Sequence, residues 1–212
     1  TLTVSIDSSS PPYAIVAGGM THVTVNVLKF HAANEPIILQ QVGLVLSNGV
    51  PADITQVGIW DGSTQVGTAV FTGNNTTAIS TLSTPVTVPS NSVKLLTIRA
   101  DIATIGTGQP GTEGDLVALD YLNSQGVGVN SGATIYGSGS TASAGIRIFK
   151  SFPIAALDST LPSTGVTDGR LLEFKIAADA AGAVSIDQFN FGIGVGTGGP
   201  PATDTNINLF AF

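Results

Sequence analysis

The chain has 212 residues, of which 42% are hydrophobic and 10% are charged, and its formal net charge at pH 7 is −7. This length suits one large or two ordinary domains, and the hydrophobic content favours a packed core over disorder. The seven Lys and Arg residues are dispersed, so we expect neither nucleic-acid binding nor attachment to anionic lipid.

The polar residues are mainly Thr, Ser, Asn, Gln and Gly, and cysteine is absent. Eukaryotic secreted domains of this size often carry disulfides. The composition therefore favours an extracellular, prokaryotic surface protein, with a viral particle as the alternative. No apolar run approaches the roughly 18 residues of a membrane span, so we expect no membrane insertion here and any anchor to lie elsewhere.

Apolar and polar residues alternate along most of the chain, which is the pattern of half-buried β-strands. The first strand is predicted at residues 2–6 and a short one at 13–16. The alternation changes phase between Val27 and Leu28, which predicts a β-bulge in the next strand. Asp61-Gly62 is a hairpin signal. The remaining strands are predicted at residues 37–46, 54–60, 65–71, 86–88, 93–102, 116–122 and 127–129.

Two segments lack this periodicity. Residues 104–114 are rich in Gly and Pro and are predicted to be a loop, and the stretch GSGSTASAG at 137–145 can serve as loop or linker. The alternation of the first strand resumes at residues 146–149. We therefore divide the chain into domains 1–144 and 145–212, both all-β, because no segment has helical periodicity.

Part of the chain is written twice. Leu28-Lys29-Phe30 recurs as Phe174-Lys175-Ile176, and the matching segments that follow keep their order with small insertions. This is a tandem repeat, and it predicts two antiparallel β-sandwiches. The expected core residues are Leu28, Phe30, Val42, Leu44, Val57 and Ile59 in the first domain, and Phe174, Ile176, Phe189, Phe191, Ile207 and Leu209 in the second.

The second sandwich looks incomplete. The sequence runs only two residues past Phe210, the counterpart of Trp60. An unpaired apolar edge invites pairing. We therefore expect the second domain to continue in a longer polypeptide, or to be completed by strand addition from a neighbouring subunit, or to be a smaller domain.

No pattern of an enzyme is present. A Ser-His-Asp hydrolase could use only His22 or His31, and the sequence has no G-x-S-x-G motif for its nucleophile. A glycosidase needs two carboxylates across a cleft, and the three glutamates do not occupy equivalent positions in the two copies: Glu35, Glu113 and Glu173. We expect no catalytic residues.

Calcium is the one cofactor that the sequence raises. Four acids flank the long loop and carry the hard oxygen atoms that Ca²⁺ prefers: Asp101, Glu113, Asp115 and Asp120. Their spacing matches no calcium motif, and the simpler interpretation is that they form turns and caps.

The opening strand TLTVS, the strand ending at Ala32-Ala33-Asn34-Glu35, the hairpin ITQVGIWDGST and the strand VPSNSVKLLTIRADI together resemble tandem Ig-like β-sandwich repeats of prokaryotic surface proteins. Such repeats occur in S-layer, adhesin and stalk-like proteins. The resemblance implies Ig-like or jelly-roll-like sandwiches, and it brings no functional residue with it.

We therefore predict a non-enzymatic structural protein of the cell surface that associates with further repeats or neighbouring subunits. Two alternatives remain open. A viral capsid or tail protein shares the architecture. A carbohydrate-binding module would use aromatic platforms, for which the candidates are Trp60, Tyr13, Tyr121 and Tyr136. Two overlapping sequons at Asn74 and Asn75 matter only in a glycosylating host.

Overall fold

The computed structural model describes residues 1–158, 170–192 and 208–210. Within these ranges the chain forms β-strands and one short 3₁₀ helix, η1 (Pro51–Asp53), and no α-helix. The prediction of an all-β chain is confirmed. The strands are β1 (Leu2–Ile6), β2 (Ala14–Ala17), β3 (Val23–Ala32), β4 (Ile37–Asn48), β5 (Ile54–Asp61), β6 (Thr64–Ala69), β7 (Thr77–Val88), β8 (Ser92–Ile102), β9 (Leu116–Gly128), β10 (Thr134–Gly139), β11 (Ile146–Phe149), β12 (Pro153–Leu157) and β13 (Phe174–Ala178).

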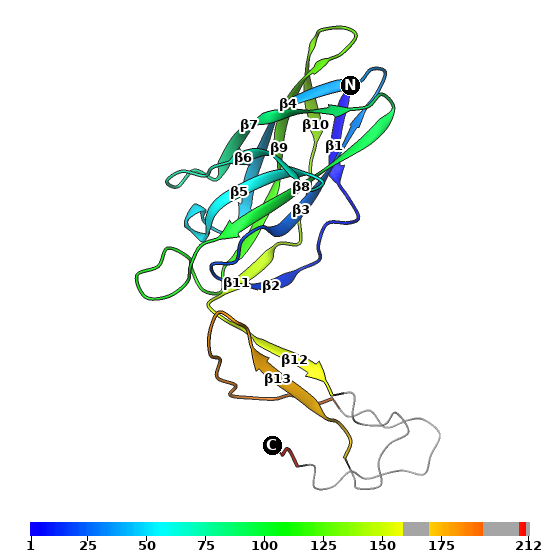
Figure 1. Cartoon of the computed structure of the whole chain (residues 1–212). Helices are drawn as coiled ribbons and strands as arrows, with labels where there is room; N and C mark the ends of the chain where they lie inside the picture. Colours follow the sequence, from blue (N-terminus) through cyan, green and yellow to red (C-terminus); the bar gives the residue numbers. More distant parts are fainter. Residues whose placement is uncertain (159–169, 193–207, 211–212) are drawn as a thin grey trace, which may run out of the picture.

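Strands β1 to β11 build a sandwich-like body (Figure 1). One layer has the order β1-β3-β8-β5-β6, and the other contains β7, β4 and β9. The long strand β9 also pairs with β10 near its end and with β11 near its start. Two parallel pairs, β1 with β10 and β11 with β2, join neighbouring parts of the fold.

The core of this body lies between the layers, as strand alternation requires. All six residues predicted for the first core are fully buried, so this prediction is confirmed. Phe30 of β3 meets Tyr121 of β9 edge-on, with ring centroids 6.2 Å apart. β3 does contain a bulge, but the register with β8 shifts between Thr24 and Asn26 and runs on unbroken through Val27 and Leu28, where the bulge was predicted.

The low-complexity stretch after residue 136 is part of the body. Gly137 and Gly139 lie in β10 and pair in parallel with β1. A side chain at Gly139 would collide with the backbone of Val4, and its φ of 144° also favours glycine. The small residues therefore allow two strands to approach closely.

Residues 146–149 form β11, whose side chains Ile146 and Ile148 are buried in the same core. The strand pairs with β2 and β9. These four residues therefore pack with the first body, although the predicted division places them after residue 144. The division itself stays a prediction.

Beyond Phe149 the described residues form the hairpin β12–β13 and contain no buried apolar side chain. The predicted core of the second domain is wrong for the residues described. Phe174 and Ile176 are partly buried, and Phe189, Phe191 and Leu209 are exposed, while Ile207 lies outside the described residues. Residues 186–191 form no strand. No described strand pairs with residues 186–191, whereas their counterpart β4 is paired on its two edges with β7 and β9.

Candidate functional site

The four acids proposed as calcium ligands do not meet. Asp101 at the end of β8 accepts a hydrogen bond from the backbone N–H of His22 at 2.6 Å. Glu113 accepts one from the N–H of Lys150 at 3.4 Å. Each carboxylate fixes a loop against the body.

Asp115 lies beside the fully buried Asp53. The oxygen atoms of Asp53 accept N–H groups from Val50 and Thr112 at 3.0 and 2.9 Å. Burial raises the pKa of Asp115, the negative charge of Asp53 and a hydrogen bond to it raise it further, and Arg147 opposes them. The pair joins η1 to the loop before β9.

Asp120 of β9 is buried between the layers and accepts several hydrogen bonds. Its Oδ1 accepts from Asn26 Nδ2 at 3.3 Å, from Thr141 Oγ1 at 2.9 Å and from the N–H of Ser143 at 2.8 Å. Its Oδ2 accepts from the hydroxyl of Ser47. Asp120 thus ties β3, β4 and the segment after β10 to β9.

In the part of the chain that the structure describes, no three His, Asp or Glu side chains gather as a metal site. The predicted set Asp101, Glu113, Asp115 and Asp120 is divided among separate hydrogen-bond networks. The interpretation as structural acids fits their surroundings better than a shared calcium ion.

The four aromatic residues of the glycan hypothesis are also dispersed. Tyr121 is buried and shares a hydrogen bond with Ser124. Trp60 is partly buried and contacts Arg99 and His22. Tyr13 and Tyr136 are exposed. Among the described ring contacts, none joins two of these four residues.

The hairpin β12–β13 repeats the pair β1–β3 in the same register. Ser5 stands opposite Lys29 in the first pair, and Ala156 stands opposite Lys175 in the second. All five positions of β12 match those of β1 in this way.

The correspondence extends past the strands. The N–H of Asp7 donates to the carbonyl of Val27 at 2.9 Å, and the N–H of Asp158 donates to that of Glu173 at 3.0 Å. At the other end, Ala33 donates to Thr1 at 2.9 Å and Asp179 donates to Phe152 at 3.0 Å. In backbone pairing, residues 152–158 therefore correspond to residues 1–7.

An electrostatic interaction between a lysine of the second strand and the aspartate that follows the first strand occurs in both hairpins. Lys29 lowers the pKa of Asp7, after the hydrogen bonds from Ser9. In the second copy, Nζ of Lys175 lies 2.6 Å from Oδ2 of Asp158, and this hydrogen bond raises the pKa of the lysine. Sequence reasoning matched residues 146–149 to β1 and missed β12, although an aspartate directly follows both β1 and β12.

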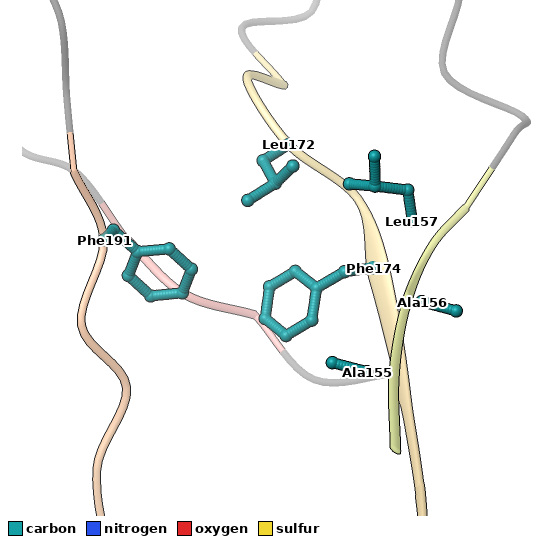
Figure 2. A pocket seen from close by; sticks show the side chains of 6 residues that line it. All are labelled: Ala155, Ala156, Leu157, Leu172, Phe174 and Phe191. Atoms are coloured by element: carbon teal, nitrogen blue, oxygen red, sulfur yellow. The ribbon is translucent and has the colours of Figure 1, made fainter. Parts of the chain in front are cut away.

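The inner face of the second hairpin is open and apolar. Leu157 is 77% exposed and Phe191 is 47% exposed. The rings of Phe174, Phe189 and Phe191 cluster with centroids 5.7–6.0 Å apart. Figure 2 shows Phe191, Phe174 and Leu172 turned toward one space beside the hairpin. This shallow pocket is lined by Ala155, Ala156, Leu157, Leu172, Phe174 and Phe191.

In the described part of the chain, no helix is both long and apolar enough for a membrane crossing. Comparisons with protein-family models, with curated proteins and with solved structures found no match. The repeated hairpin with its open apolar face is therefore the candidate site, and its chemistry is that of strand and sheet packing.

Proposed function

We propose that this chain is a non-enzymatic extracellular structural protein of prokaryotes that builds a surface layer, filament or adhesive stalk from tandem β-sandwich repeats. The observation that carries the proposal is the register match between β12–β13 and β1–β3. A hairpin that repeats the pairing of β1 and β3 directly after the first body suits a protein extended by repetition.

The first sandwich is also arranged to transmit tension. The N-terminus lies near one end of the body, and β11, the last strand of the body, lies near the other (Figure 1). β1 pairs with β10 in parallel. The chain leaves the body through β11, which pairs in parallel with β2. A pull between the N-terminus and the end of β11 would therefore load two parallel pairs in shear, β1 with β10 and β11 with β2.

The surface chemistry supports the same function. The chain is acidic, has few charged residues and lacks cysteine. Its carboxylates hold loops, as Glu35 does by accepting N–H groups from Asn130 and Ser131 at 3.0 and 2.9 Å. The dispersed aromatic residues give the carbohydrate-binding alternative no shared platform.

The test is to locate the protein on the cells that produce it. Antibodies raised against residues 1–149 are applied with gold label to intact and to permeabilised cells, with pre-immune serum as control. We expect label on intact cells, arranged as a continuous layer or along filaments in electron micrographs. Label seen only after permeabilisation, or label on virus particles, would contradict the proposal.

A further inference from the structure

In the first repeat β3 is covered on both edges. β1 pairs with one edge and β8 with the other. In the second repeat β13 pairs with β12, and no described residue pairs with its other edge. The first repeat therefore shows which strand belongs at that edge, namely a counterpart of β8.

The backbone of β13 is oriented for such a partner. Glu173 and Asp179 bond toward β12 through their carbonyl and N–H groups. Because successive residues of a strand point their backbone groups to opposite sides, Phe174, Ile176 and Ala178 direct theirs to the other edge. In the first repeat the equivalent residue Ala32 accepts the N–H of Asn91, just before β8.

The side chains specify the pattern of the partner. Leu28 stands opposite Leu96, and Asn26 stands opposite Ile98. Their counterparts in the second repeat are Phe174 and Leu172, which line the open apolar pocket. A strand with apolar residues at the positions of Leu96 and Ile98 would cover this pocket while completing the sheet.

We propose that the edge of β13 opposite β12, with which no described residue pairs, accepts a donated antiparallel β-strand with the alternating pattern of β8. The leucine of this strand would lie opposite Phe174 and its isoleucine opposite Leu172. This inference rests on the proposed function and specifies how neighbouring repeats are joined. Main-chain hydrogen bonds supply affinity in such strand addition, and the alternate side chains supply specificity.

The donor is a separate strand of this pattern and not β8 of a second copy. In the folded chain β8 lies between β3 and β5 and is paired on both edges. Withdrawing it would open the core around Leu96 and Ile98, which are fully buried.

The test uses the full chain and a synthetic peptide with the β8 sequence of residues 92–102. Binding is followed by anisotropy of the labelled peptide, and amide hydrogen exchange is followed by NMR. We expect saturable binding, with new protection of the amides of Phe174, Ile176 and Ala178 and no change in those of β3.

Matched variants test the register. A peptide carrying Leu96→Asp and Ile98→Asp should not bind, whereas one carrying Leu95→Asp and Thr97→Asp, with the same added charge on the other face, should bind. In the chain, Ala178→Pro removes an edge N–H and should weaken binding about tenfold. Ala180→Pro, in the turn closed by Gly182 N–H and the Asp179 carbonyl, should leave it unchanged.

Three outcomes would overturn the inference. They are no binding of the native peptide, protection of the three amides in the monomeric chain before peptide is added, and protection of the same amides through dimerisation of the chain. If the chain binds the peptide but is not found on the cell surface, the inference that β13 accepts a strand is supported and the proposed function is contradicted.

Discussion

The guanidinium carbon of Arg99 lies 4.6 Å from the centroid of the Trp60 ring. His22 meets the same ring edge-on at 5.3 Å. A Cβ at Gly58 would lie 2.6 Å from Nε1 of Trp60, so the indole lies closely over this glycine. Arg99, His22 and Gly58 thus hold the ring against the outside of β5 and β8.

Removing the arginine should free this ring. We expect Arg99→Ala to shift the Trp60 fluorescence maximum to longer wavelength and to lower the free energy of unfolding by about 0.5–2 kcal/mol, the range of a cation–π contact. Urea unfolding and emission spectra measure both effects. Soluble sugars should leave the emission of the native chain unchanged, and quenching by a sugar would favour the carbohydrate-binding alternative.

The two repeats should differ in how much their equivalent side chains stabilise the fold. Leu44 is fully buried, whereas its counterpart Phe191 is 47% exposed. We expect Leu44→Ala to lower the free energy of unfolding by about 2–5 kcal/mol and Phe191→Ala to change it by roughly 0.5 kcal/mol or less. Denaturant unfolding of both variants measures the contrast, and equal losses would mean that Phe191 is covered in solution.

The alternation of side chains was sufficient to predict the first core. Phe30, Leu44 and Ile59 are buried because each lies on the inner side of a strand that is paired on both edges and faces the other layer. The same reasoning failed for Phe189 and Phe191, since a strand's apolar side is buried only when another layer covers it. The alternation of side chains shows which side of a strand is apolar, but it does not show whether a second layer of strands packs against that side.

The candidate site was predictable only in part. The match between Lys29 and Lys175 is visible in the sequence, and it located β13. The match between β1 and β12 was hidden because Ala155 and Ala156 replace Val4 and Ser5, so the alternation is weak. Only the backbone pairing revealed it. Asp120 was noticed as an acid, but its partners Asn26 and Thr141 are too distant in sequence to predict.

The Asp53–Asp115 pair should make stability fall as pH rises. The pKa of Asp115 is raised above its ordinary value of 3.8. Between the ordinary pKa and the raised pKa of the folded state, the folded chain binds more protons at Asp115 than the unfolded chain does. The contribution of Asp115 to stability is therefore lost as the pH increases through this window. We expect Asp115→Asn, which cannot ionise, to gain stability relative to the native chain across this window and then to hold a constant difference.

The comparison must be made between the two proteins at each pH. Glu35 and Asp7 have lowered pKa values because of hydrogen bonds from Ser131 and Ser9, so they add stability as pH rises and oppose Asp115. Denaturant unfolding from acid to neutral pH measures the difference curve, from which these shared contributions cancel. A difference that is flat through the acid range would show that Asp115 titrates normally.

Asp120 should stabilise the first sandwich without any metal ion. Replacing it by alanine removes the acceptor of the partly buried donors of Thr141 and Ser143 and leaves the buried amide of Asn26 with only the carbonyl of Leu119. We expect Asp120→Ala to lower the free energy of unfolding by about 3–5 kcal/mol. Asp120→Asn keeps one acceptor oxygen and should lower the free energy of unfolding by less than half as much.

Because these donors already occupy the carboxylate of Asp120, millimolar calcium or a chelator should leave the melting temperature of the native chain unchanged. Thermal unfolding with and without calcium measures this, and a rise that disappears in Asp101→Ala or Asp120→Ala would restore the calcium hypothesis.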